Sequence, residues 1–527
     1  MSRTTTTRIV KTLLFLLGSL AAAAVLAAPP SRQAIDDIVR RAMDEFDVPG
    51  MAVSVVYGGN VYYAAGHGIA EIGGNEAVDE RTLFQIGSVT KAFTAAALAI
   101  LADDGRLSFD DRVIDHLPAF RMFDPWVTRE FTIRDLLTHR SGLPLGAGDL
   151  LMFPNGKTTR DEIVHALRYL EPSSSFRSQF AYDNLLYIVA GEVVAAAAGM
   201  PFEAFLEQRL LRPLGMDDCA ATVQRAAPGA EIATPHLLMD GELQTTGTRA
   251  GPLVAAAGGI ACSAQGMARW MTFMLGDGVT PGGGRLLSAA QFGELTRPVT
   301  ILPAPAYLVE HGGSALSAYA LGWGVSSFYG QPIFSHGGGL WGMTTFIAVM
   351  PEQDLAVFAS NNQMSAAPRA VVNDILDRFL ADVSPAAGQD WIAIISGVAQ
   401  GRQDAGAEAV RKAFAERHAD SKPSLPLEAY TGTYRDAWYG DVHVTLADDG
   451  RLWFRAERSD SLAGPLEHFQ YDTFVARWVD RQLMADAYVS FTLDPAGEVE
   501  RIRMKAVSPT TDFSFDFHDL DLARVAQ

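Results

Sequence analysis

Ser88 and Lys91 lie three residues apart in the stretch "FQIGSVTKAFTAAALAIL". Residues at this spacing share one face of a helix, so a hydroxyl and an amine can meet there. If Ser88 opens the helix, the free N–H groups and the positive end of the helix dipole favour negative charge that develops at this point. Burial on an apolar helix lowers the pKa of a lysine and lets it accept a proton. The pair can therefore activate a hydroxyl as a nucleophile.

A serine that caps a helix, followed by a lysine on the helix surface, would give the same spacing. Two observations favour the chemical interpretation. Only Lys91 has a serine three residues before it among the lysines of the chain, which are Lys11, Lys91, Lys157, Lys412, Lys422 and Lys505. The flanking residues are apolar, which suits a buried helix better than one that faces water.

Tyr182 and Asn184 precede a second long apolar stretch, "FAYDNLLYIVAGEVV". In a turn, a phenol and an amide at this spacing can point to the same side. The phenol can then share a proton with a serine and a leaving group, and the amide can hold a substrate carbonyl. The alternative is that Asn184 caps the helix and Tyr182 only packs. Asp183, between them, is expected to be exposed.

His336 comes directly before Gly337, Gly338 and Gly339 in "IFSHGGGLWG", at the end of an expected strand. Consecutive glycines let a substrate backbone lie close against a strand edge. The N–H of Gly339 can face a developing oxyanion, and with the N–H of Ser88 it would form a hole with two donors. A turn of glycines with a surface histidine is the alternative.

The three motifs together, in this order along the chain, resemble the active-site motifs of the serine β-lactamase and penicillin-binding protein superfamily. The similarity is greatest to its class C β-lactamase-like branch of D-peptidases and esterases, and "LLTHRSGLP", "RPLGMDD" and "AAGGIACSA" support it over Gln33 to Val383. The resemblance implies that Ser88 forms an acyl-enzyme and that Lys91 and Tyr182 handle the proton. It also implies that Asn184 binds the substrate amide.

By the same resemblance, His336 occupies the place where many relatives carry the lysine of a Lys-Thr-Gly motif. A lysine there is a fixed cation suited to a substrate carboxylate, whereas a histidine is charged only near or below its own pKa and can also donate as a neutral group. The resemblance includes D-peptidases and esterases with histidine at this place. His336 therefore bears on substrate preference and not on catalysis.

The expected function is that of a serine hydrolase that cleaves amide or ester bonds through acyl-Ser88. Small peptides, among them peptides with D-residues, and esters are the expected substrates. Two alternatives stay open: a β-lactamase that hydrolyses β-lactam rings, and a non-catalytic protein that binds a ligand and keeps a vestigial hydrolase fold. No Gly-x-Ser-x-Gly or His-Glu-x-x-His motif is present, which disfavours an α/β-hydrolase and a zinc protease.

The hydrophobic patterns indicate the elements that must position these motifs. Residues 51–68 read as two strands joined at Gly58-Gly59-Asn60, and strands recur over 318–330, 331–339 and 344–362. Helical spacing is found over 33–46, 90–105, 131–142, 184–199 and 263–278. One sheet built from both ends of the domain, with a helical insert, fits this order. With the resemblance, the expected class is α/β (α+β), β-lactamase/transpeptidase-like: an antiparallel sheet flanked by helices, with an all-helical subdomain and a C-terminal antiparallel β-barrel.

The expected domains are a hydrolase domain over residues 29–384, a helical linker over 385–424 and a barrel over 425–527. Short alternating strands over 441–457, 470–478, 487–507 and 511–520, with Asp-Gly and Ala-Gly turns, predict an antiparallel barrel. This part resembles the lipocalin-like barrel attached to some peptidases of the same branch. Its aromatic residues suggest two roles: it caps the active site and limits substrate size, or it mediates homo-oligomerisation.

Residues 1–28 have the pattern of a secretory signal peptide, with basic residues, an apolar run from Leu13 to Leu26 and cleavage near Ala27 or Ala28. An uncleaved N-terminal anchor is the alternative. A signal peptide implies a periplasmic or secreted protein without stable membrane insertion after cleavage. The net charge of −19, with no basic cluster, argues against a nucleic-acid partner.

The chain has two cysteines, Cys219 and Cys262. In an exported protein they could form one disulfide or remain two buried thiols, and they are too few for a structural zinc site. We expect no metal and no cofactor. The histidines at 116, 139 and 165 sit in helical patterns and are expected to be structural.

Overall fold

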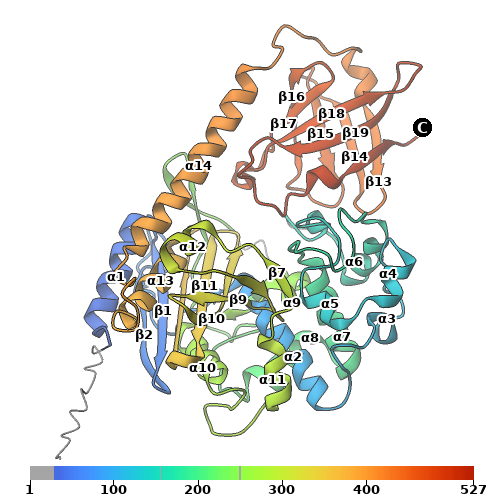
Figure 1. The fold of residues 1–527 in the computed structure, drawn as a ribbon. Coiled ribbons are helices and arrows are strands. Elements are labelled where there is room, and N and C mark those ends of the chain that lie inside the picture. Colours follow the sequence, from blue (N-terminus) through green and yellow to red (C-terminus); the bar gives the residue numbers. More distant parts are fainter. Residues whose placement is uncertain (1–28, 155, 248–250, 527) are drawn as a thin grey trace, which may run out of the picture.

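The computed structural model describes residues 29–154, 156–247 and 251–526. The expected signal peptide, residues 1–28, lies outside the described residues. Figure 1 shows a mixed α/β domain and a barrel above it, joined by one long helix, α14 (Trp391–Ala415). The predicted fold class, with its antiparallel sheet, helical subdomain and C-terminal barrel, is confirmed.

The N-terminal domain, which the sequence motifs predict to be the hydrolase domain, is built on one antiparallel sheet with the strand order β2-β1-β12-β11-β10-β9-β8-β7. Its two halves meet where β1 pairs with β12, so that Met51 lies opposite Asn361. The sheet is thus assembled from both ends of the domain, as predicted. Its strands are β1 (Gly50–Tyr57), β2 (Asn60–Gly68), β7 (Thr300–Leu302), β8 (Ser317–Tyr319), β9 (Gly324–Phe328), β10 (Gln331–Leu340), β11 (Met343–Met350) and β12 (Leu355–Asn361).

Helices cover both faces of this sheet (Figure 1). On one face lie α1 (Arg32–Glu45) and α13 (Ala367–Phe379), which contact each other and share a core with β1, β11 and β12. The buried residues of α1 recur at helical spacing, which gives this helix its single apolar face: Ile35, Ile38, Val39 and Ala42. On the other face, α10 (Ala264–Leu275) packs against β1 and β12.

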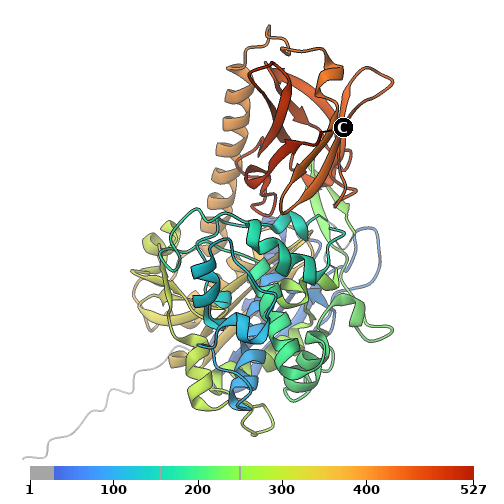
Figure 2. The same ribbon diagram turned by 90° about the vertical axis from the view of Figure 1, so that its right-hand side faces the viewer.

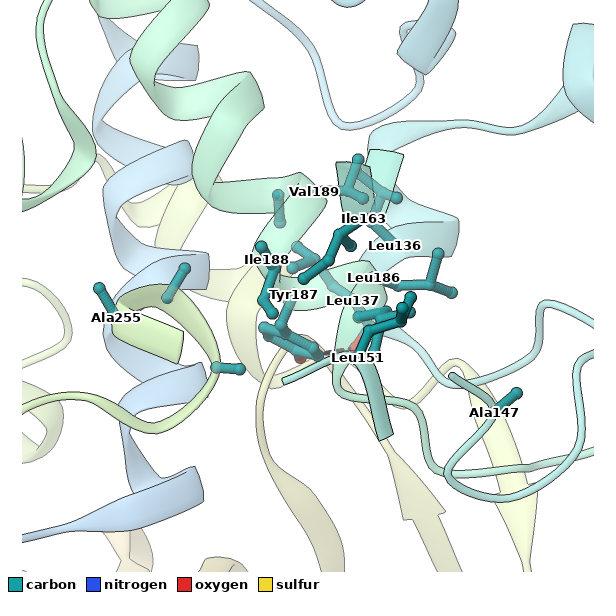
Figure 3. Packing of buried hydrophobic residues seen from close by; sticks show 14 of the residues in the cluster. Leu136, Leu137, Ala147, Leu151, Ile163, Leu186, Tyr187, Ile188, Val189 and Ala255 are labelled. Atoms are coloured by element: carbon teal, nitrogen blue, oxygen red, sulfur yellow. Dashed lines mark hydrogen bonds between the residues drawn. The ribbon is translucent and has the colours of Figure 1, made fainter. Parts of the chain in front are cut away.

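The all-helical part packs around α7 (Leu185–Ala198), which contacts α2 (Thr90–Asp103). Figure 3 shows its core, where Leu186, Ile188 and Val189 of α7 lie near Leu136 and Ile163. Nearly every residue of α2 is buried, and the buried set includes Lys91. The other helices of this part are α3 (Val113–His116), α4 (Pro125–Glu130), α5 (Ile133–Leu137), α6 (Arg160–Ala166), α8 (Phe202–Leu206) and α9 (Ala255–Gly258).

Among the described residues no single helix is long and apolar enough to cross a membrane; one bent pair, Leu185–Ala198 with Phe202–Leu211, passes that test jointly, with a bend of 74°. The two cysteines form a disulfide, Cys219–Cys262, which closes a loop of sequence separation 43. Cys262 lies in the short strand β6 (Ala261–Cys262), which pairs with β3 (Phe84–Gln85) just before Ser88.

The C-terminal domain is a closed antiparallel barrel in which neighbouring strands follow the chain order (Figure 2). Buried aromatic rings fill its interior, with Tyr430, Phe474 and Phe491 in mutual contact and Trp478 against Phe454. The strands are β13 (Gly432–Asp436), β14 (Gly440–Leu446), β15 (Leu452–Ala456), β16 (Ala463–Gln470), β17 (Thr473–Ala476), β18 (Ala487–Leu493), β19 (Val499–Ala506) and β20 (Asp521–Arg524).

The strand predicted over residues 511–520 is wrong. This segment is part of the connection between β19 and β20 and contains only a 3-10 turn, Phe517–Asp519. Its alternating phenylalanines are explained by packing and not by sheet pairing, because Phe515 contacts Phe153 and Trp341 of the hydrolase domain, with ring centroids 5.3 and 6.3 Å apart. We call residues 507–516 the barrel loop.

Candidate active site

Ser88 is in a 3-10 turn, Gly87–Val89, that leads directly into α2, so it does open the helix. The turn is fixed from two sides. Strand β3 pairs with β6 before it, and Ile86 N–H donates to Ile260 O at 2.9 Å. Gly87 adopts φ +52, and a Cβ there would come within 2.7 Å of Gly339 N, so only glycine fits between this turn and β10.

Lys91 is fully buried, and its Nζ lies 3.1 Å from Ser88 Oγ. The amine also donates to Asn184 Oδ1 at 2.7 Å and to the carbonyl of Ala257 at 2.9 Å. Burial lowers the pKa of Lys91 to about 7, although the nearby carboxyls of Asp149 and Asp183 act in the opposite direction. Near neutral pH a substantial fraction of this amine is uncharged and can take a proton from Ser88.

Tyr182 lies in the loop before α7, with its ring centroid 4.8 Å from Lys91 Nζ. Burial raises the pKa of Tyr182 well above its usual value, while its hydrogen bond with Ser88 acts against this shift. The side chain therefore stays a phenol and can donate a proton at neutral pH. The buried His139 packs on this ring, with centroids 4.1 Å apart, and its Nδ1 accepts from the N–H of Asp183 at 3.1 Å.

Asn184 is at the start of α7 but its side chain does not cap the helix. It binds Lys91 through Oδ1 and donates from Nδ2 to Asp149 Oδ2 at 2.8 Å. Asp183, expected to be exposed, is fully buried, and its Oδ1 accepts from Leu186 N–H at 3.1 Å. The alternative interpretation of Asn184 as a helix cap is therefore not seen: the carboxyl of Asp183 binds the helix N-terminus, and the amide of Asn184 binds Lys91 and Asp149.

His336 is in β10 and is buried, with 8% of its surface exposed. Its Nδ1 lies 2.6 Å from Gly337 O, a pure acceptor, so Nδ1 carries the proton; Nε2, 2.8 Å from the Tyr319 hydroxyl, then accepts. Burial is the main cause that lowers the pKa of His336 to about 3, and the charge of Lys91 adds to it. His336 is therefore a neutral group at physiological pH, unlike the lysine of a Lys-Thr-Gly motif.

The three glycines after His336 lie beside Ser88. Strand β10 pairs with β9 only as far as Ser335. Beyond that residue, the same edge of β10 lies next to the 3-10 turn Gly87–Val89, which we call the serine turn. A Cβ on Gly338 would lie 2.0 Å from Ile86 O and 3.2 Å from Ser88 N. The backbones of β10 and the serine turn therefore touch beside Ser88.

These groups line a cleft of about 330 Å³. Its walls are mostly apolar, and one side comes from the barrel domain, through Asp512, Phe513 and Ser514 of the barrel loop. The remaining lining residues are Ser88, Met152, Phe153, Tyr182, Asn184, Val254, Ala257, Gly258, His336, Gly337, Gly339, Leu340, Trp341 and Met364. All the predicted site residues except Lys91 and Gly338 thus border the cleft. Lys91 contacts Ser88 through its amine, and Gly338 lies against the backbone of the serine turn.

Sequence reasoning missed Asp149, His139, Tyr319 and the barrel loop as parts of this site. Asp149 is fully buried in a connecting segment without a periodic pattern. The only available signal for the barrel loop was the dense mixture of Phe, Asp and Ser in "TDFSFDF", which is unusual for a strand that has one solvated face. Across the described part of the chain, no group of three or more His, Cys, Asp or Glu is placed to hold a metal ion.

Comparison with protein families agrees with this geometry. The model described as "Beta-lactamase" matches residues 35–382, and the model of a domain of unknown function, DUF3471, matches residues 416–524. The chain belongs to the β-lactamase family. The resemblance predicted from the motifs is thereby confirmed, as is the prediction that the chain is a serine hydrolase of this family.

This β-lactamase family member is 29% identical to the unguisins hydrolase ungD' of Aspergillus campestris over 459 residues, 82% of this chain and 81% of that protein. It is 30% identical to penicillin-binding protein 4 of Amycolatopsis lactamdurans over 318 residues, 58% of this chain and 79% of that protein. The octameric penicillin-binding protein homologue from Pyrococcus abyssi has the same fold, with a TM-score of 0.60, 19% identity and coverage of 93% of this chain and 99% of that one.

Proposed function

We propose that this protein hydrolyses amide or ester bonds of small peptides or esters through an acyl-enzyme on Ser88, and that its preferred substrates carry no carboxylate beside the bond that is cleaved. The observation that carries the first part is the buried amine of Lys91, 3.1 Å from Ser88 Oγ. The name of the related unguisins hydrolase supports hydrolysis, and penicillin-binding protein 4 supports a site of the penicillin-recognising type.

In the acylation step, neutral Lys91 takes the proton of Ser88 as Oγ attacks the substrate carbonyl carbon. The carbonyl oxygen becomes an oxyanion, which the N–H groups of Ser88 and Gly339 can stabilise. The proton passes through the Tyr182 hydroxyl to the leaving nitrogen or oxygen, and the bond from the carbonyl carbon to that atom breaks. Asn184 holds Lys91 in place through its Oδ1.

In the deacylation step, a water molecule takes the place of the leaving group. The Lys91–Tyr182 pair accepts its proton as the water oxygen attacks the acyl carbon. The bond between that carbon and Ser88 Oγ then breaks, Oγ recovers a proton, and the acid product leaves. The same groups thus serve both halves of the reaction, and no cofactor takes part in either half of this scheme.

The substrate preference rests on the charges around the cleft. His336 is neutral, and among the lining residues that the structure describes there is no lysine or arginine. Arg369 is near Gly337 but belongs to α13, on the opposite face of β10, where its guanidinium lies over the Phe346 ring and donates to Tyr307 Oη at 3.0 Å. Asp512 adds a carboxylate to the wall. A substrate carboxylate would meet repulsion there and no cation.

A matched substrate pair tests this preference: N-acetyl-D-alanyl-D-alanine and its C-terminal amide. We expect kcat/KM for the amide to exceed that for the acid by at least about tenfold, which corresponds to about 1.4 kcal/mol. A preference for the acid, or rapid hydrolysis of benzylpenicillin, would overturn the proposal and favour a carboxypeptidase or a β-lactamase. Ser88→Ala must abolish turnover of both substrates if the acyl-enzyme scheme holds.

The barrel domain narrows the cleft, and we propose that it limits substrate size. Phe513 lies against Tyr182, with ring centroids 5.9 Å apart, so the barrel loop borders the space next to Ser88. Homo-oligomerisation through the outer barrel surface is compatible with this role and is also a proposal; the Pyrococcus abyssi homologue is described as octameric.

We further propose a periplasmic or secreted location. The Cys219–Cys262 disulfide is compatible with an oxidising compartment, where such bonds form and persist.

A further inference from the structure

The barrel loop reaches the catalytic lysine through a chain of hydrogen bonds. Ser514 Oγ of the barrel donates to Asp149 Oδ2 at 2.9 Å, and the same oxygen accepts from Asn184 Nδ2 at 2.8 Å. Asn184 Oδ1 in turn accepts from Lys91 Nζ at 2.7 Å. Three hydrogen bonds therefore connect a residue of the second domain to the amine beside Ser88.

The barrel loop also fixes the backbone on both sides of Asp149. Asp516 is fully buried and accepts from the N–H of Gly148 at 2.7 Å through Oδ2 and from the N–H of Leu150 at 3.0 Å through Oδ1. At Gly146, which has φ +73, a Cβ would come within 2.7 Å of Phe513 O. The segment that carries Asp149 is thus held by the barrel at its side chain and at its backbone.

From this geometry we infer that Ser514 is a positioning residue of the hydrolase site, which acts through Asp149 and Asn184 to set the orientation and the charge state of Lys91. The inference rests on the proposed function, because it assigns Lys91 the role of base toward Ser88. It means that the C-terminal domain supplies part of the catalytic apparatus in addition to a wall of the cleft.

The charged groups around Lys91 determine in which direction its pKa moves when the Ser514 hydroxyl is removed. Asp149 and Asp183 raise the pKa of the amine, and burial lowers it. The histidines that face it, His139 and His336, have pKa values that burial lowers. Tyr182 and Tyr187 also face the amine, and burial raises the pKa of both phenols.

The charge of Asp149 depends on its own neighbours in the same way. Burial and Asp183 raise its pKa well above the usual value, whereas the hydrogen bonds from Asn184 and Ser514 and the charge of Lys91 lower it. Asp149 and the buried Asp516 also oppose each other's ionisation. Loss of the Ser514 hydroxyl raises the pKa of Asp149 further and so reduces its negative charge, and the pKa of Lys91 then falls.

The test measures how fast a fluorophosphonate probe labels Ser88 as a function of pH in the full-length protein. We expect Ser514→Ala to move the acid limb of the labelling rate to lower pH by about half a unit to one unit, and Ser514→Thr, which keeps the hydroxyl, to restore it. Ser508→Ala is the matched control: it removes a hydroxyl from the same loop, and this hydroxyl hydrogen-bonds Thr510 within the loop. We expect no shift there.

An unshifted acid limb in Ser514→Ala, whether or not the labelling rate changes, would overturn the inference and leave Ser514 as a substrate-contacting or packing residue. Failure of the proposed function gives a different result: the wild-type protein would not be labelled at Ser88. Asp149→Asn provides an independent check, because removal of the charge itself should shift the limb in the same direction as Ser514→Ala.

Discussion

At the scale of single residues, burial decides the chemistry of this site. The same loss of solvent that gives Lys91 a pKa of about 7 keeps Tyr182 protonated and His336 neutral. Each of the three is thereby in the form that its proposed role needs at neutral pH: a base, a proton donor and an uncharged wall. The sequence indicated the base, because an apolar helix surrounds Lys91. It did not indicate that His336 is neutral, because that depends mainly on the burial of the ring next to Lys91, which only the folded structure shows.

The pH dependence of activity follows from the lysine. The folded pKa of Lys91 lies below that of a free lysine, so the amine is protonated and inactive below about pH 7 and neutral above it. We expect kcat/KM to rise through about pH 7. Lys91→Arg, which stays cationic, should reduce kcat/KM on the order of 10²- to 10⁴-fold. Lys157→Arg, at an exposed ion pair with Asp460, is the matched control. A profile that is flat between about pH 5 and pH 9 would contradict the assignment of Lys91 as the base.

At the scale of elements, the site depends on how closely β10 approaches the serine turn. Gly338→Ala would place a Cβ 2.0 Å from Ile86 O, a backbone atom, so the strand or the turn must move. We expect a loss of activity of at least about tenfold, since a displacement of the order of 1 Å has large effects on reacting groups. Activity and thermal unfolding together check this prediction.

The control for this substitution is Gly397→Ala in α14, where an added Cβ meets no atom within 4 Å. There alanine should leave activity unchanged and slightly stabilise the helix. Full activity of Gly338→Ala would show that the contact between β10 and the serine turn is not needed.

The helices and strands were predicted correctly where a hydrophobic pattern came from packing against one core, or where a turn required glycine. The buried faces of α1 and α10 gave helical spacing, and the hairpin of β1 and β2 turns at Gly58 and Gly59, both with positive φ as a tight turn requires. The barrel loop was mistaken for a strand because its phenylalanines alternate for a different reason. They fill space between two domains, and a contact between domains leaves no period in the sequence.

At the scale of the whole molecule, the barrel and the hydrolase domain form one site. Besides Ser514, polar contacts join them at Lys157 with Asp460, at Arg458 with Glu162 and at Thr246 with Gln482. The sequence predicted a barrel and suggested that it caps the site. The docking itself could not be predicted, because its central groups, Asp149 and Asp516, lie in irregular segments far apart in the sequence.

Asp516 tests the importance of docking. In Asp516→Asn, one carboxylate oxygen is replaced by an NH₂ group that faces a backbone N–H of Gly148 or Leu150. We expect a loss of about 1–3 kcal/mol in unfolding free energy, together with easier proteolysis of the barrel and slower labelling of Ser88. Asp460→Asn, which removes an exposed ion pair across the same interface, should change stability by less than about 1 kcal/mol. Equal effects of the two variants would show that Asp516 is not central to docking.

The measurement that tests the central claim most directly is the intact mass of the protein during turnover of p-nitrophenyl acetate, quenched in acid and followed by peptide mapping. We expect one acetyl group per chain on Ser88, which disappears as the substrate is exhausted, and no adduct in Ser88→Ala. An acetyl group on another residue, or turnover by Ser88→Ala at the wild-type rate, would contradict the account of this protein as a hydrolase that acts through acyl-Ser88.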